Sequence, residues 1–156
     1  MIDVNDTIDL NFPVRFVENG EKREASFSEL ITRPTVVSVY MRNNTSSCDK
    51  QAKQLQVIAK ELDTAGFGII ALSKDTPGSH LKYASKHELS FPLVSDPEHA
   101  FAKATQSLVE KKMYGKTFLG PTRSAYLIEP GGKVLGVVEK VDSAAHGQQL
   151  RELVGS

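Results

Sequence analysis

The stretch that decides the fold is TVVSVYM at residues 35–41, followed by the polar loop RNNTSS at residues 42–47 and then by Cys48. Four of its first five residues are β-branched and Pro34 stands before it, which predicts a buried strand. Beyond Cys48 the apolar residues recur at helical spacing and form one stripe. The stretch therefore predicts a strand, a loop and a helix in succession, the stripe of the helix being Ala52, Leu55, Ile58, Ala59 and Leu62.

The helix after Cys48 carries its own start and stop signals. Ser46 or Ser47 can cap its first turn, and Gly66 closes it. A second buried strand is expected at residues 68–72, where the sequence is GIIAL.

The rest of the chain continues the alternation of strands and helices. Residues 7–30 indicate short extended pieces with a hairpin turn at Asn19-Gly20. Glu129-Pro130-Gly131-Gly132 fits a type II turn and predicts an antiparallel hairpin between the strands on either side. The order of elements is that of a thioredoxin-like α/β fold, a central mixed sheet with helices on both faces. The further elements are a helix at 79–87, a short strand at 91–95, a helical turn from Asp96-Pro97 through Phe101, strands at 124–128 and 134–141, and a helix at 144–154.

Composition indicates a single domain over residues 1–156. Nineteen basic and nineteen acidic residues cancel, which disfavours nucleic acid or an anionic membrane as a partner. The chain has no apolar run of membrane-spanning length, and its acidic N-terminus does not resemble a secretory signal. One cysteine forms no internal disulfide, so a reducing compartment, the cytoplasm, is expected.

Cys48 is the strongest candidate for a reactive residue. It is predicted to lie in the first turn of a helix that leaves the carboxyl end of a central strand, where open α/β sheets bind ligands. Unpaired backbone N–H groups and the helix dipole favour thiolate over thiol there, and the thiolate is the nucleophile. The alternative is a small buried hydrophobe, a common fate of a lone cysteine. The polar neighbours Ser46, Ser47, Asp49 and Lys50 favour the functional interpretation.

The residues around Cys48 resemble the peroxidatic loop of peroxiredoxins. Tyr40, then Thr45-Ser46-Ser47-Cys48, with Gln51 three residues on, is similar to Pro-x-x-x-Thr-x-x-Cys preceded by an aromatic residue. The bacterioferritin comigratory protein, or peroxiredoxin Q, group is the most similar branch. Matches in family order cover roughly residues 5 to 150; they are Asn44-Thr45-x-x-Cys48-x-Lys50-Gln51, Ser79-His80, FPLVSD at residues 91–96, Glu110-Lys111-x-Met113-Tyr114-Gly115-Lys116 and RSAYLI at residues 123–128.

The resemblance implies reduction of hydrogen peroxide and small organic hydroperoxides without metal, haem or flavin. Cys48 would attack the peroxide and become a sulfenic acid. The Thr45 hydroxyl would serve the thiolate and the peroxide, and Arg123 would activate the thiol and hold the peroxide oxygens. Backbone N–H groups of Ser47 and Cys48 would complete the cradle. Gln51 would tether Arg123 or is an ordinary helix residue, and members of this branch are often monomers.

Two departures from the family pattern stand out. Met41 occupies the position of the motif proline, which normally shields the cysteine and shapes the loop. The resolving cysteine of many relatives is absent, since Lys53 and Ala84 stand at the two positions where it occurs. An external thiol, such as thioredoxin, glutaredoxin or a low-molecular-weight thiol, must therefore reduce the sulfenic acid, unless a second cysteine was removed by engineering.

Other functional signals are weaker. Gly115-Lys116-Thr117 resembles the end of a phosphate-binding loop, but Glu110 stands where that motif needs glycine. No Cys-x-x-Cys is present, and the four histidines lack metal-binding spacing. His80 would reach the edge near Cys48 only if the loop after the second strand folds back. Two alternatives stay open, a redox-sensing or binding module without turnover and a thiol-transfer enzyme.

Overall fold

The computed structural model describes residues 1–155, apart from the side chain of Met113. Within that part of the chain no helix has both the length and the apolar character to cross a membrane. The elements are β1 (Pro13–Glu18), β2 (Glu21–Ser26), α1 (Phe27–Leu30), β3 (Thr35–Val39), α2 (Ser46–Thr64), β4 (Gly68–Ser73), α3 (Pro77–His87), β5 (Leu93–Ser95), α4 (Ala100–Ala104), β6 (Leu108–Met113), β7 (Lys116–Pro121), β8 (Ala125–Ile128), β9 (Val134–Val138) and α5 (His146–Gly155).

The described strands form one seven-stranded mixed sheet and a separate hairpin of β6 and β7. The sheet order is β2-β1-β5-β4-β3-β8-β9, so β3 and β4 lie near its centre. The strands β3, β4 and β5 run parallel, whereas β1, β8 and β9 join antiparallel to their neighbours. Because β8 is antiparallel to β3, the start of β8 lies at the carboxyl end of β3, where α2 begins. The predicted mixed sheet is confirmed.

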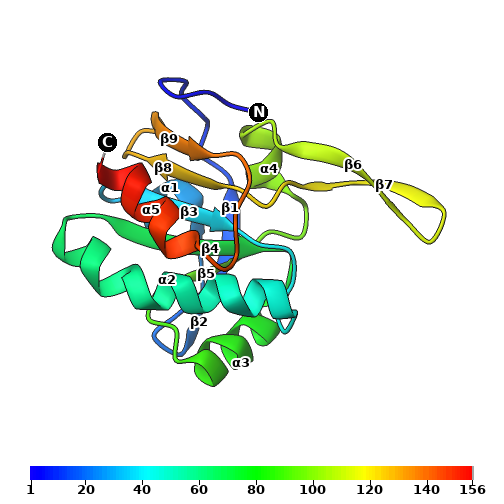
Figure 1. Cartoon of the computed structure of the whole chain (residues 1–156), viewed down its shortest axis with the longest axis horizontal. Helices are drawn as coiled ribbons and strands as arrows, with labels where there is room; N and C mark the ends of the chain where they lie inside the picture. Colours follow the sequence, from blue (N-terminus) through cyan, green and yellow to red (C-terminus); the bar gives the residue numbers. More distant parts are fainter. Residues whose placement is uncertain (156) are drawn as a thin grey trace.

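Alternate residues of the central strands face two separate apolar layers. Val36, Ile69 and Leu127 pack with α2, α3 and α5 on one face. On the other face Val37 and Ile70 pack against α1, α4 and the N-terminal segment. Figure 1 shows the long helix α2 lying along the sheet, with α5 beside it and α3 at its edge. Helices therefore cover both faces, but those on the second face are only one turn or so long.

The two predicted turns adopt the backbone conformations that their residues favour. Asn19 and Gly20 both have positive φ, as a type I′ hairpin turn between β1 and β2 requires. In the loop before β9, the Gly132 N–H donates to the Glu129 carbonyl at 3.0 Å and Gly131 has a φ of 98°, as in a type II turn. These local signals were sufficient because each depends on residues within the turn itself.

Several boundaries differ from the expectation. The helix α2 begins at Ser46, so its N-cap is Thr45, and the prediction of a Ser46 or Ser47 cap was wrong. The strand β3 ends at Val39, short of the predicted residue 41, because the chain turns there into the loop that precedes α2. The β6–β7 hairpin is not among the predicted elements. It turns at Tyr114-Gly115, with positive φ at both residues. Three charged residues, Glu110 to Lys112, follow one another in β6, and no described side chain of the hairpin belongs to either layer of the core.

Candidate active site

Cys48 lies at the carboxyl end of β3, in the first turn of α2, where the sequence predicted it. Its side chain is only 1 % exposed and packs with Tyr40, Ala52 and Leu55. The first backbone bond of the helix is donated by Asp49 N–H to the Thr45 carbonyl at 2.8 Å. The N–H groups of residues 46–48 precede that bond and have no partner within the helix. The sulfur is thus buried beside the positive end of a 19-residue helix.

Arg123 contacts Cys48 although the two residues lie far apart in the sequence. Its Nη2 atom donates to Cys48 Sγ at 3.1 Å, across a separation of 75 residues. The strand β8 brings it there, because the Val39 N–H donates to the carbonyl of Ser124, the next residue, at 2.8 Å. The predicted proximity of Arg123 and Cys48 is confirmed. The guanidinium of Arg123 and the start of α2 therefore both lie beside the sulfur of Cys48.

The other expected site residues take different positions. Thr45 Oγ1 donates to the Arg42 carbonyl at 3.1 Å, so its hydroxyl must rotate to serve Cys48 or a peroxide. Ser47 is exposed at the start of α2. Gln51 is buried, and its Nε2 atom donates to Ser38 Oγ at 2.7 Å and to the Val39 carbonyl at 3.2 Å.

Gln51 Oε1 is buried and, among the described residues, has no hydrogen-bond partner. The expected tether to Arg123 would have used this oxygen as acceptor, because the guanidinium nitrogens of Arg123 and the amide nitrogen of Gln51 can only donate. The tether is therefore not formed in this structure. Gln51 instead joins the start of α2 to the end of β3.

Two tyrosines form the inner wall of the site. Tyr40 and Tyr83 stack with ring centroids 6.3 Å apart, and the Tyr83 hydroxyl donates to Asp49 Oδ1 at 2.6 Å. Burial raises the pKa of Tyr40 far above its ordinary value. A hydrogen bond with Ser73 lowers this pKa in part, and the charges of Asp75 and Cys48 raise it. Burial likewise raises the pKa of Tyr83, followed by its contact with Asp49. Both phenols stay protonated beside the sulfur.

A buried polar cluster behind Tyr40 was not foreseen. His80 Nε2 lies 3.1 Å from the Val94 carbonyl, which places the ring proton on Nε2. The other nitrogen, Nδ1, then accepts from Asn43 Nδ2 at 3.2 Å, while the Tyr40 hydroxyl donates to Asn43 Oδ1. Burial lowers the pKa of His80 to about 4, although the charge of Asp75 opposes that shift. The cluster holds the loop before Cys48 with neutral groups.

The signal for this cluster was present but incomplete. Ser79-His80 belongs to the segments that match the family, yet the sequence alone did not show that α3 begins beside Tyr40. The loop after β4 does fold back, since Asp75 Oδ2 accepts from the Asn43 N–H at 3.0 Å and from Ser73 Oγ at 2.7 Å. His80 is accordingly a hydrogen-bonded core histidine.

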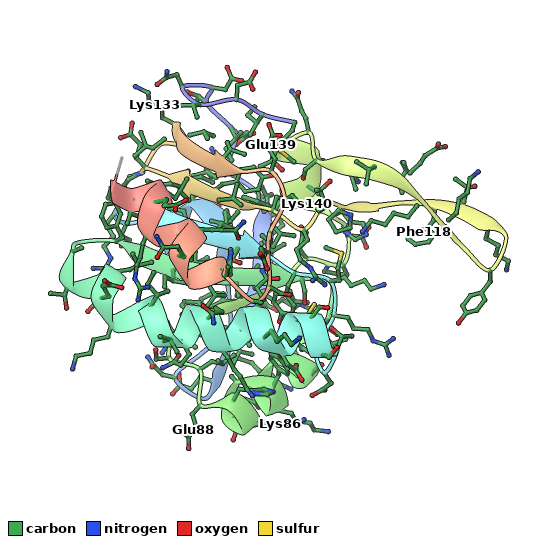
Figure 2. All side chains as sticks on the ribbon, viewed as in Figure 1. Lys86, Glu88, Phe118, Lys133, Glu139 and Lys140 are labelled. Carbon is green, nitrogen blue, oxygen red and sulfur yellow. The ribbon has the colours of Figure 1, made fainter. Side chains whose placement is uncertain are left out.

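The β6–β7 hairpin contributes a cation to the rim of the site. It projects from the end of the molecule at which α2 begins, and Phe118 lies on it (Figures 1 and 2). Lys111 Nζ lies 3.2 Å from Met41 Sδ, the residue at the motif-proline position. Burial lowers the pKa of Lys111, and the neighbouring charges of Arg123 and Lys74 lower it further.

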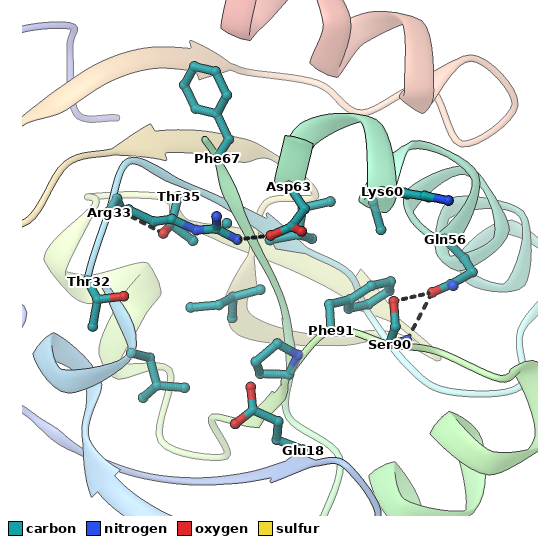
Figure 3. A pocket seen from close by; sticks show the side chains of 16 residues that line it. Glu18, Thr32, Arg33, Thr35, Gln56, Lys60, Asp63, Phe67, Ser90 and Phe91 are labelled. Carbon is teal, nitrogen blue, oxygen red and sulfur yellow. Dashed lines mark hydrogen bonds and ion pairs between the residues drawn. The ribbon is translucent and has the colours of Figure 1, made fainter. Parts of the chain in front are cut away.

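A separate surface pocket of about 520 Å³ lies at the other end of the central strands. Figure 3 shows the Arg33–Asp63 ion pair and the hydrogen bonds from Ser90 to Gln56 on its wall. Its lining includes Thr35 and Gly68, the first residues of β3 and β4, so it faces away from Cys48. It is not part of the thiol site.

Comparison with known proteins identifies the family. A model of the AhpC/TSA family matches residues 7–137, most of the chain. The chain belongs to the AhpC/TSA family. Peroxiredoxin Bcp of Xanthomonas campestris pv. campestris is 36% identical to this AhpC/TSA protein over 115 residues, 74% of this chain and 72% of that one.

Solved structures agree with this assignment. Peroxiredoxin Q of Xanthomonas campestris aligns with a TM-score of 0.83 at 28% identity, covering 94% of this chain and 91% of that chain. The bacterioferritin comigratory protein of the same organism, studied for its alkyl peroxide reduction activity, aligns with a TM-score of 0.86 at 27% identity over 98% of each chain. The expected peroxiredoxin family and thioredoxin-like fold are confirmed, and thiol-dependent peroxide reduction is the activity that these relatives support.

Proposed function

We propose that this AhpC/TSA protein reduces hydrogen peroxide and small organic hydroperoxides with Cys48 as its nucleophile. The observation that carries the proposal is the 3.1 Å contact between Arg123 Nη2 and Cys48 Sγ in the first turn of α2. The Cys48 sulfur is buried and has one cationic donor beside it. Such a site suits an electrophile that loses its hydration shell before the sulfur attacks it. Peroxides are such electrophiles and supply no charge of their own to pair with Arg123.

In the first half-reaction, a sulfur lone pair of Cys48 attacks the terminal peroxide oxygen. The O–O bond breaks, the departing alkoxide or hydroxide takes up a proton, and Cys48 becomes a sulfenic acid. Arg123 carries five N–H donors, so it can retain the sulfur and also bind the peroxide oxygens on which charge develops. The Thr45 hydroxyl and the N–H groups of Ser47 and Cys48 are the further donors. Tyr40 and Gln51 act by fixing the wall and the helix start.

In the second half-reaction, an external thiol must attack the sulfenic acid sulfur and release water. A second thiol then attacks the external sulfur of the mixed disulfide and releases Cys48 in its reduced form. Lys53 is exposed and Ala84 half-buried at the positions where relatives carry a resolving cysteine, and neither has a sulfur. Thioredoxin, glutaredoxin or a low-molecular-weight thiol fits this requirement. The need for such a thiol supply supports action in the cytoplasm, and we propose that the protein works as a monomer.

Stopped-flow oxidation of the reduced protein by hydrogen peroxide and by tert-butyl hydroperoxide tests the proposal. The second-order rate constant of Cys48 should exceed that of free cysteine at the same pH by roughly 10²- to 10³-fold or more. The Cys48→Ser variant should consume no peroxide on this timescale. A wild-type rate equal to that of free cysteine would exclude the peroxidase and favour a binding or sensing role. A mixed disulfide formed readily by exchange with a low-molecular-weight disulfide, such as oxidised glutathione, in the absence of peroxide would favour thiol transfer.

A further inference from the structure

Met41 is a second sulfur at the rim of the Cys48 site. It stands where the family motif has proline, and its partly exposed side chain packs against both apolar layers, one of which contains Cys48 and Tyr40. Lys111 Nζ lies 3.2 Å from its sulfur. A thioether is oxidised by peroxides, so this position differs chemically from the inert proline of the motif.

The position of Lys111 is built by the hairpin. Its β-sheet partner on β7 is Phe118, and the next residue on the same face of β7 is Gly120. A Cβ at Gly120 would lie 3.1 Å from Lys111 Cδ and 3.3 Å from Cε, so the absence of a side chain there leaves room for the lysine stem. The hairpin thereby directs an ammonium group at Met41 across 70 residues of sequence.

This ammonium group is poorly satisfied. The hydrogen-bond acceptor that the described part of the chain gives Lys111 is the Met41 thioether, which is a weak acceptor. Lys111 is also partly buried, and the charges of Arg123 and Lys74 act on it unfavourably. None of the ion pairs among the described residues includes Lys111. An oxygen on the Met41 sulfur would be a stronger acceptor for the ammonium group than the thioether is.

We propose that Met41 is a second peroxide-reactive residue, and that Lys111 binds the methionine sulfoxide formed there. A lone pair of the Met41 sulfur attacks the terminal hydroperoxide oxygen, a sulfur–oxygen bond forms and the O–O bond breaks. The departing oxygen leaves as an alcohol or water with the hydroperoxide proton, so the step needs no reactant besides the peroxide. The proposal rests on the proposed function, since the peroxide is the substrate of the Cys48 site.

The modification has a consequence for Cys48. The sulfoxide is polar where the thioether is apolar, and it accepts a hydrogen bond from Lys111 that ties the β6–β7 hairpin to the loop over Cys48. A polar, tethered side chain at the wall of the site slows the approach of the next peroxide. Methionine sulfoxide reductases reverse the change. Met41 therefore records peroxide exposure in a form that thiols alone do not erase.

Peptide mapping by mass spectrometry of the Cys48→Ser protein, treated with excess tert-butyl hydroperoxide, gives the first test. Met1 is the internal control because it is exposed to 39% and lies outside the site. Met41 should gain one oxygen faster than Met1 despite its lower exposure, and Lys111→Leu should reduce that preference. Met41 oxidation no faster than that of Met1 would overturn the proposal, whatever the rate of Cys48 in the wild-type protein.

The second test measures the effect on activity. Wild type and Met41→Leu are each treated with peroxide and then with dithiothreitol, which restores Cys48 from the sulfenic acid but leaves methionine sulfoxide intact. Each protein is compared with its own untreated sample by stopped flow. The rate of wild type should fall and recover after methionine sulfoxide reductase, whereas Met41→Leu should keep its rate. An equal loss in both proteins, or no recovery, would contradict the proposal, and a wild-type rate that was slow before treatment would instead count against the peroxidase.

Discussion

Replacing Arg123 by Ala removes the cation that contacts the Cys48 sulfur. The contact is a 3.1 Å hydrogen bond from Arg123 Nη2, on a partly exposed side chain, to the Cys48 sulfur, on a side chain that is only 1 % exposed. A hydrogen bond to a charged group contributes about 1.5–3 kcal/mol net. If that energy is available to the thiolate and to the transition state, the rate constant with peroxide should fall roughly 10- to 150-fold.

The assay is stopped-flow oxidation under single-turnover conditions, so that the external thiol plays no part. Arg33→Ala is the matched control, because it removes an arginine whose ion pair with Asp63 lies at the other end of the central strands. Arg33→Ala should retain the wild-type rate. Arg123→Lys should be intermediate, since it keeps the charge and loses the planar fork. An Arg123→Ala rate within about twofold of wild type would refute the role of this contact.

Three further predictions concern the site and the fold. Cys48→Ser should abolish peroxide reduction and leave the thermal unfolding midpoint nearly unchanged, because no disulfide is lost; a collapsed midpoint would instead indicate a structural role. Burial holds the pKa of His80 at about 4, below the ordinary 6.5, so the unfolded chain binds this proton more readily and stability should fall by about 3 kcal/mol as the pH drops from 6.5 to 4. Urea unfolding at several pH values measures that loss. If the free energy of unfolding of His80→Gln falls with decreasing pH as steeply as that of wild type, a group other than His80 causes the loss. Gly132→Ala should destabilise by roughly 2–3 kcal/mol, since φ is 99° and a Cβ would collide with the Ile8 carbonyl; Gly131→Ala, with similar φ and open space, should cost only about 1 kcal/mol, and equal losses in urea unfolding would exclude the collision.

The sequence predicted the part of the fold that depends on local pattern. The buried strand predicted at residues 35–41 (of which 35–39 form β3), the apolar stripe of α2 and the turns at Asn19-Gly20 and Pro130-Gly131 each have signals within a few residues. The position of Cys48 followed from the order of strand, loop and helix. The neighbour Arg123 needed the family resemblance, because only the antiparallel pairing of β8 with β3 brings it to that edge.

The parts that the sequence did not predict depend on packing between distant segments. His80 meets Asn43 only because the loop after β4 returns α3 to the sheet edge, a geometry that no local pattern encodes. Lys111 meets Met41 because a hairpin outside the two core layers projects over the site, and such a hairpin has no buried face to leave a period in the sequence. The role expected for Gln51 differed because its amide binds the end of β3 instead of Arg123.

Cys48 should be the residue that peroxide oxidises first. Reduced protein is treated with one equivalent of hydrogen peroxide in the presence of dimedone, a diketone that traps sulfenic acids, and the adduct is located by peptide mass spectrometry. One dimedone adduct per chain is expected, confined to the peptide that contains Cys48 and absent from Cys48→Ser. A protein that stays reduced while peroxide remains in solution would contradict this expectation.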